Sequence, residues 1–267
     1  MQSPFITLFL ELDDKDEYIE ETALIIEEII KQRLQGIKNE KGVYITPTFP
    51  KLVYLLDENN IHKDSKYRYI TDLCIKCCAK RMNPDFISAK IMRENYEGNT
   101  FGPMGCRALL SPWKGENGKY KFEGRFNIAA ISLNLPQVAI LAQKDTEAFW
   151  EILDQRLLLI KEGLLKRIEL LERATSDTSP IHWQHGAIAR LGKHEPIAPL
   201  LKNGYATISL GYIGLYEAVK LMTGKSHTEE KEFALEIMKY LRASVDSWKK
   251  ETGYGFALYG TPKTLGL

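Results

Sequence analysis

Short apolar segments alternate with amphipathic helices along most of this chain, and that alternation limits the possible folds more than any other feature. The strand-like segments are residues 5–10, 43–45, 52–56, 127–136, 206–214 and 256–259. The segments with apolar residues spaced by threes and fours are 22–34, 70–81, 146–173, 215–222 and 229–250. Strands joined through helices pair in parallel rather than as hairpins. We therefore expect an α/β fold with a largely parallel sheet.

Composition and charge exclude several classes of protein. The chain has 267 residues, of which 44% are hydrophobic and 27% charged, as in globular proteins with a sizeable core. The 36 Lys and Arg nearly balance the 35 Asp and Glu, so the basic excess of a nucleic-acid-binding protein is absent. No apolar run approaches the roughly 20 residues that span a membrane. The first residues do not resemble a secretory leader, so we expect a cytoplasmic protein.

Three of the four cysteines lie in one predicted helix. Cys74, Cys77 and Cys78 form a C-x-x-C-C cluster, and Cys74 and Cys77 share a helical face with Ile70 and Leu73. Free cysteine packs well in apolar cores, and no second Cys or His pair has the spacing of a zinc site. We interpret the cluster as core packing, with a metal or redox site as the alternative.

The fourth cysteine has different surroundings. Cys106 lies in the sequence Gly-Pro-Met-Gly-Cys-Arg, which indicates a loop rather than a helix or strand. Glycine and proline on either side allow a tight backbone excursion that can bring the sulfur close to a ligand. From the residues alone, both a functional thiol and an ordinary loop cysteine remain possible.

Two further segments carry groups that could bind or react. His182 and His185 are spaced so that they could share one helical turn, either as ligands or acid–base groups or in hydrogen-bonded structural roles. The glycine-containing turn before residues 215–222 joins a strand to a helix, a geometry that can hold an anion or serve packing alone. Residues 115–119 are expected to form a surface hairpin turn.

Several motifs together resemble one known family. The Cys106 loop is followed by Gly-Arg-Phe-Asn-Ile at 124–128 and Ser-Leu-Asn-Leu-Pro at 132–136. Further matching blocks are residues 2–5, 46–54, 79–85, 182–186, 203–217 and 259–262. With these blocks, which extend from end to end, the chain is similar to the catalytic large chain of anaerobic (class III) ribonucleotide reductase, a glycyl-radical enzyme.

The resemblance implies a fold and a set of site residues. It implies that residues 1–267 are the central part of a ten-stranded α/β barrel with a central finger loop. Cys106 would carry a transient thiyl radical that abstracts the ribose 3′ hydrogen, and Asn127 would hydrogen-bond ribose hydroxyls. Substrate-binding positions are expected at Thr207, Ser209 and Gly211.

The resemblance also implies partners that complete the chemistry. The family's nucleotide cone and its C-terminal region with a zinc site and the radical glycine have no counterpart in this sequence. We therefore expect no cofactor or metal on this chain. The glycyl radical would come from that C-terminal region after activation by an iron–sulfur, S-adenosylmethionine-dependent enzyme. The expected substrate is a ribonucleoside triphosphate, and the full enzyme is expected to be a homodimer.

Two alternatives stay open at this level. Another glycyl-radical enzyme of the pyruvate formate-lyase type would share the barrel and a loop cysteine but act on small acids. The chain could instead be a non-catalytic remnant or an assembly module of a split reductase.

Overall fold

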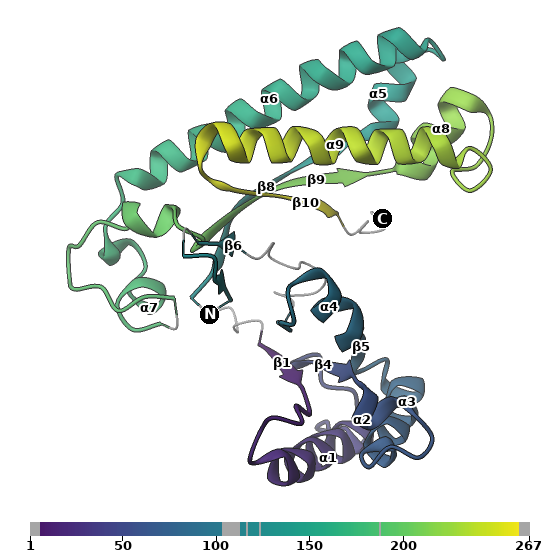
Figure 1. The fold of residues 1–267 in the computed structure, drawn as a ribbon, viewed down its shortest axis with the longest axis vertical. Helices are drawn as coiled ribbons and strands as arrows, with labels where there is room; N and C mark the ends of the chain where they lie inside the picture. Colours follow the sequence, from purple (N-terminus) through teal and green to yellow (C-terminus); the bar gives the residue numbers. More distant parts are fainter. Residues whose placement is uncertain (1–5, 103–112, 116, 123, 187, 262–267) are drawn as a thin grey trace. The chain divides into compact units, whose positions relative to one another are not determined.

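The protein consists of two compact units, residues 1–109 and 110–267 (Figure 1). The structure is a computed structural model, and it describes residues 6–102, 113–115, 117–122, 124–186 and 188–261. Each unit contains its own three-stranded parallel sheet and its own apolar core.

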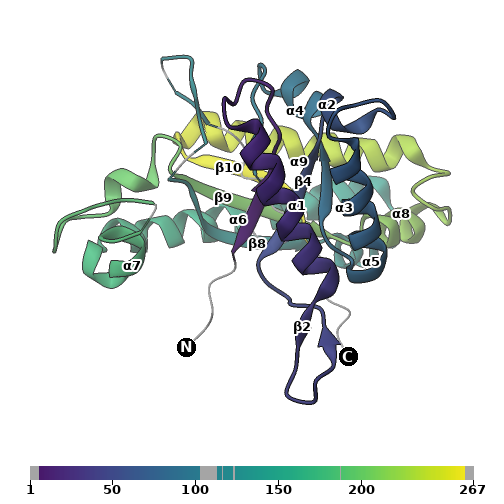
Figure 2. The same ribbon diagram turned by 90° about the horizontal axis from the view of Figure 1, so that it is seen from below.

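The first unit is built around the sheet β1-β4-β5. Its elements are β1 (Thr7–Leu10), α1 (Ile19–Gln35), β2 (Ile37–Lys38), β3 (Tyr44–Ile45), β4 (Lys51–Leu56), α2 (Glu58–Ile61), α3 (Arg68–Arg81), β5 (Asp85–Ser88) and α4 (Ala89–Asn95). β4 pairs in parallel with both neighbours, and β2 and β3 form a small antiparallel hairpin, which Figure 2 shows beyond the end of α1.

Helices α1 and α3 lie side by side and bury the apolar core of the first unit (Figure 2). Ile26 and Ile30 of α1 meet Ile70 of α3 and Tyr54 of β4 in one buried cluster. Arg81, in the last turn of α3, donates hydrogen bonds to the carbonyls of residues 34 and 35 at the end of α1. These are carbonyls that a helix leaves without an internal partner, so the bonds from Arg81 join the two helix ends.

The second unit is built around the sheet β10-β9-β8. Its main elements are the hairpin β6 (Trp113–Lys114) and β7 (Tyr120–Lys121), then β8 (Phe126–Asn134), α5 (Leu135–Ala142), α6 (Thr146–Glu172), α7 (Pro180–Trp183), β9 (Ala206–Ile213), α8 (Leu215–Thr223), α9 (Lys231–Thr252) and β10 (Gly255–Gly260). Short 3₁₀ turns lie at Ser176–Thr178 and Ala198–Leu201.

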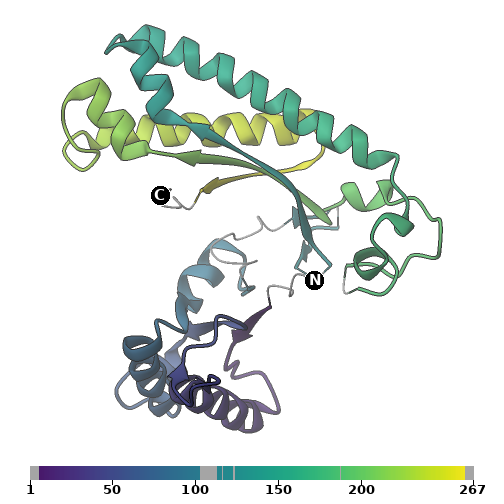
Figure 3. The same ribbon diagram turned by 180° about the vertical axis from the view of Figure 1, so that it is seen from behind.

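Helices α6 and α9 cover one face of the β8-β9-β10 sheet (Figures 1 and 3). α6 buries residues at helical spacing, among them Phe149, Leu157 and Leu164, against Ile208 and Leu210 of β9. Parallel strands need a crossover between them, and here α5 with α6, and α8 with α9, supply it. The helices therefore make the parallel pairing possible and also shield one face of the sheet.

The expectation of an α/β fold with parallel strands is confirmed. All five predicted helices are present, and β6 and β7, on either side of the predicted hairpin turn, pair in antiparallel. One boundary was wrong: Leu135 and Pro136, expected to end a strand, begin α5 instead. Asn134 accepts a hydrogen bond from the Gln137 N–H and caps that helix, and proline is well tolerated in a first turn.

Paired leucine substitutions in α6 should show how much the helix–sheet core contributes. Leu164 is fully buried, whereas Leu159 on the same helix is 60% exposed. We expect Leu164→Ala to lower the free energy of unfolding by about 2–5 kcal/mol, because it leaves a cavity, and Leu159→Ala by less than about 1 kcal/mol. All four tryptophans lie in the second unit, so tryptophan fluorescence during urea unfolding reports on it. Equal effects would contradict the assigned burial.

The cysteine cluster packs in the core of the first unit, as predicted. Cys74 and Cys77 are fully buried and Cys78 is partly exposed. Burial raises the pKa of the Cys74 thiol to about 12 and that of Cys77 above its ordinary value. Within the described residues there is no group of three metal-ligating side chains.

Alkylation rates should follow this difference in exposure. At pH 8 we expect iodoacetamide to modify Cys78 at least about tenfold faster than Cys74, because only an accessible thiolate reacts. Peptide mapping by mass spectrometry measures the rates, and the urea-unfolded protein, in which the thiols should react alike, is the control. Comparable native rates at Cys74 and Cys78 would contradict the packing.

Candidate functional site

The sheet of the second unit has one apolar face and one face of small and polar residues. Side chains alternate along a strand, so Ile208 and Leu210 of β9 point to the helices, and Thr207, Ser209 and Gly211 point to the opposite face. This second face is the polar face. Thr207 and Ser209 are 1% and 5% exposed, respectively. The three predicted substrate-binding positions therefore share one surface.

A β-bulge in β8 brings Asn127 to the same face. Asn127 pairs with Thr207, but Ala129 pairs with Ile208, so one extra residue, Ile128, interrupts the register. Without the bulge, Asn127 would alternate onto the face of Ala129 and Leu133, which pack against the helices. The bulge instead aligns Asn127 with Thr207 on the polar face.

The amide oxygen of Asn127 has an unmet requirement for a hydrogen-bond donor. Asn127 Oδ1 is buried and has no hydrogen-bond partner within the described part of the chain. Leaving a buried acceptor unpaired costs about 1–3 kcal/mol. A ligand hydroxyl could donate to this oxygen, and the amide nitrogen could donate in return.

Arg125, two residues before Asn127 in the sequence, fixes the geometry at this end of the polar face. Its Nε donates to the Gly204 carbonyl at 2.9 Å, and its Nη2 donates to Thr207 Oγ1 at 3.1 Å. Burial lowers the pKa of Arg125 to about 10, so the guanidinium is still charged at neutral pH. Because Thr207 Oγ1 accepts from Arg125, its own O–H remains available as a donor. No role for Arg125 follows from the sequence, although it lies in the Gly-Arg-Phe-Asn motif.

Gly211 lies at the other end of the polar face, where the chain packs too closely for a side chain. A β-carbon there would lie 2.3 Å from Thr261 Oγ1 and 2.8 Å from Ser132 Oγ. Those two hydroxyls hydrogen-bond to each other at 2.7 Å and connect β8 to the residue after β10. Gly211 therefore provides space rather than a functional group.

The other predicted groups fall in different places. Cys106 lies outside the described residues. His182, at the exposed end of α7, has its Nδ1 2.6 Å from Ser179 Oγ. His185 lies beyond the end of α7, so the two histidines do not share a helix. Gly214, the residue before α8, has a left-handed φ of 73°, and a β-carbon there would meet the Pro136 ring at 2.3 Å. This close contact favours the packing interpretation of the turn. Among the helices the structure describes, none could span a membrane.

Comparisons with known proteins all point to one family. Residues 1–263 match the family model described as anaerobic ribonucleoside-triphosphate reductase. Curated reductases of that name from Escherichia coli K12 and Haemophilus influenzae are 39% and 37% identical to the chain over 274 residues, and that of Enterobacteria phage T4 is 35% identical over 269. Each alignment covers 98% of this chain, but only 36% of the two bacterial enzymes and 42% of the phage enzyme.

Solved structures share the fold. Anaerobic ribonucleotide reductase from Thermotoga maritima with dATP bound in the specificity site superposes with a TM-score of 0.63, and its complex with dATP and CTP with 0.59. Both comparisons cover 96% of this chain and 42% of the other, at 16% sequence identity. The likeness confirms the predicted fold class, a partial segment of the family's α/β barrel.

Substitution of Gly211 tests how closely Thr261 and Ser132 pack against it on the polar face. We expect Gly211→Ala to lower the free energy of unfolding by about 1–3 kcal/mol, because Thr261 and Ser132 must move to admit the methyl group. Ser132→Ala, the control, removes a hydroxyl without adding volume and should cost at most about 1 kcal/mol. Urea unfolding followed by tryptophan fluorescence measures both, and a neutral Gly211→Ala would contradict the packing.

Proposed function

The chain belongs to the anaerobic ribonucleoside-triphosphate reductase family, and we propose that it carries the part of such an enzyme that faces the ribose of the substrate. The observation that carries the proposal is the buried, unpartnered Asn127 Oδ1 on the polar face. It supplies an acceptor where a sugar hydroxyl would donate, and Thr207 supplies a donor beside it. The chain spans 36% of the length of its bacterial relatives, so activity requires the remainder of the enzyme.

The reaction assigned to these residues is reduction of a ribonucleoside triphosphate. The Cys106 thiyl radical takes the 3′ hydrogen atom of the ribose, which leaves a thiol on the protein and a radical on the 3′ carbon. The 2′ hydroxyl then leaves as water after protonation, formate or a thioredoxin-like protein supplies two electrons, and protons come from solvent. The Cys106 thiol finally returns its hydrogen atom to the 3′ carbon, which completes the deoxyribonucleotide and regenerates the thiyl radical. Asn127 holds the ribose hydroxyls during these steps, and Thr207 and Ser209 bind the substrate alongside it.

The thiol of Cys106 becomes a thiyl radical only with help from outside this chain. A glycyl radical, generated by an iron–sulfur, S-adenosylmethionine-dependent activating enzyme, supplies the oxidising equivalent. We propose that the complete enzyme is a cytoplasmic homodimer that interacts with this activating enzyme.

The comparisons favour a reductase over an enzyme of the pyruvate formate-lyase type, because the family model and the relatives all carry the reductase name. The second candidate is a non-catalytic remnant or an assembly module of a split reductase.

The test is deoxyribonucleotide formation under anaerobic conditions, with the remaining regions and the activating enzyme supplied. We expect Cys106→Ser to abolish product, since serine cannot carry the radical, and Asn127→Ala to lower the rate at least about a hundredfold, as for loss of a positioning group. Cys78→Ser, a cysteine-to-serine change in the first unit, is the control and should keep activity. A soluble, assembled mixture without activity would support the remnant, and full activity of Cys106→Ser would refute the assignment.

A further inference from the structure

The chain is anchored within the first unit shortly before Cys106. Phe101 is buried, and its ring meets the Tyr96 ring edge-on with the ring centres 4.9 Å apart. Gly102 lies against the Phe9 side chain of β1, where a β-carbon on the glycine would be 3.4 Å from the phenylalanine β-carbon. Gly102 is four residues before Cys106 in the sequence. The described chain therefore ends, on this side of the cysteine, packed against β1.

Local hydrogen bonds set the course of the chain between α4 and this anchor. Glu97 and Gly98 both have positive φ, 53° and 83°, and form a turn after the helix. The Gly98 N–H donates to the Arg93 carbonyl, and Asn99 Nδ2 donates to the Tyr96 carbonyl at 2.8 Å. The chain that leaves this turn is thus directed before it reaches β1.

One long-range hydrogen bond joins the turn to the end of β1. Thr100 Oγ1 donates to Glu11 Oε1 at 2.7 Å. Glu11 directly follows Leu10, the last residue of β1, and its side chain is 25% exposed. Hydrogen bonds to an ionised carboxylate are stronger than those between neutral groups. This bond therefore fixes Thr100 at the carboxyl end of β1.

Arg93 and Asp57 hold the Glu11 carboxylate in turn. Arg93 contacts Asp57 through both Nη atoms, at 2.8 and 2.6 Å, and its Nη2 lies 3.9 Å from Glu11 Oε1. Asp57 follows β4 and caps α2, and its N–H donates to the side chain of the buried Asn60. A bidentate pair of this kind fixes orientation as well as distance. The guanidinium next to Glu11 is thus held by a rigid strand end.

We propose that Glu11 is a positioning residue for the Cys106 thiol, acting through Thr100 and supported by Arg93. The inference rests on the proposed function, in which that thiol must meet the ribose 3′ hydrogen. Four residues of chain span at most about 14 Å, so a shift at Gly102 carries over to the cysteine. A misplacement of about 1 Å can lower a rate about a hundredfold. Glu11 thus acts through the direction of the chain and not through contact with the substrate.

Pulsed electron paramagnetic resonance can follow residue 106 in the intact protein whether or not the protein is an active reductase. One spin label is attached to Cys106 and the other at an exposed position of α3, in a Cys78→Ser/Lys76→Cys background. Cys74 and Cys77 are fully buried, so they compete little for the label. Both labelled positions belong to the first unit, so the distance between them does not depend on how the units are arranged.

Variants of the two bonded side chains test the proposal. We expect Glu11→Ala and Thr100→Val to widen the distance distribution at least about twofold, because residue 100 loses its link to β1. Glu11→Gln keeps an acceptor oxygen and Thr100→Ser keeps the hydroxyl, so both should retain the wild-type width. Glu21→Ala, which removes an exposed carboxylate from α1, is the matched control. Unchanged widths in Glu11→Ala and Thr100→Val would overturn the proposal, even if both variants were less stable.

Activity provides the second measurement, in the anaerobic assay with the remaining regions supplied. We expect Glu11→Ala to lower kcat at least about tenfold and to leave the KM of the ribonucleotide within about twofold, because the proposed binding groups Asn127 and Thr207 are untouched. Glu11→Gln should restore most of the rate. A lower free energy of unfolding with unchanged kcat would show a merely structural role and refute the proposal. An assembled wild type without activity would count against the proposed function alone, since the distance measurement does not need turnover.

Discussion

The parallel pairing of β8, β9 and β10 under helices α6 and α9 is the constraint on which the second unit depends. It brings Asn127, Thr207 and Thr261 onto one sheet although they are far apart in the chain. The helices bury the apolar face of that sheet and so fix which residues face the other way. Burial of a core thus decides where the polar groups of the candidate site lie.

Within that sheet, one β-bulge and one position without a side chain determine which polar groups meet on the polar face. The bulge at Ile128 aligns the Asn127 amide with Thr207, and the absence of a side chain at Gly211 admits Thr261. Arg125 then holds Thr207 by a hydrogen bond, so the direction of the threonine hydroxyl is set by a buried cation. Bulges are common near functional sites because they redirect a side chain without breaking the sheet.

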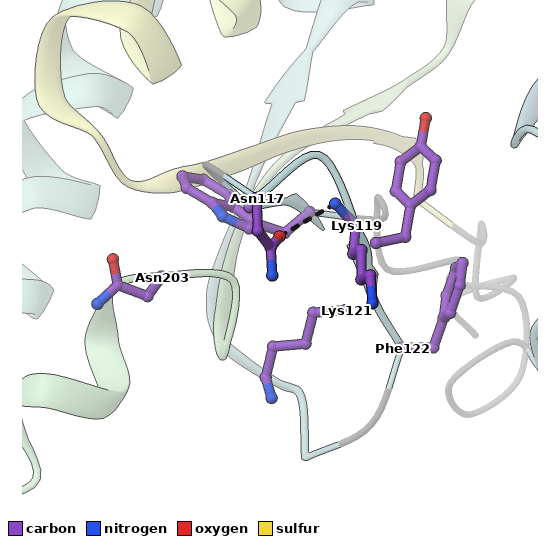
Figure 4. Close-up of a pocket in the computed structure, with 8 residues that line it drawn as sticks. Asn117, Lys119, Lys121, Phe122 and Asn203 are labelled. Carbon is purple, nitrogen blue, oxygen red and sulfur yellow. Dashed lines mark hydrogen bonds between the residues drawn. The ribbon is translucent and has the colours of Figure 1, made fainter.

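The cationic side chains of the second unit lie in two different environments. Arg125 is buried and bonded to backbone and side-chain oxygens, so it acts on the architecture of the sheet. Lys119 and Lys121 lie on the β6–β7 hairpin and its turn (Figure 4), and Lys121 Nζ lies 4.0 Å from the centre of the Tyr205 ring. The tight turn at Gly204 connects the two, because it contacts Arg125 through its carbonyl and Trp113 through its α-carbon.

Periodicity alone predicted the five longer amphipathic helices, the parallel class of the sheets and the burial of Cys74 and Cys77, because those depend on local spacing of apolar residues. It did not predict β5 or the start of α5 at Leu135. The motifs around Cys106 and Asn127 also pointed to the family. Tertiary structure decided which face Asn127 occupies, since strict alternation would have turned it toward the helices. It also revealed Arg125, whose role depends on Gly204 and Thr207, residues that only strand pairing brings within hydrogen-bond distance.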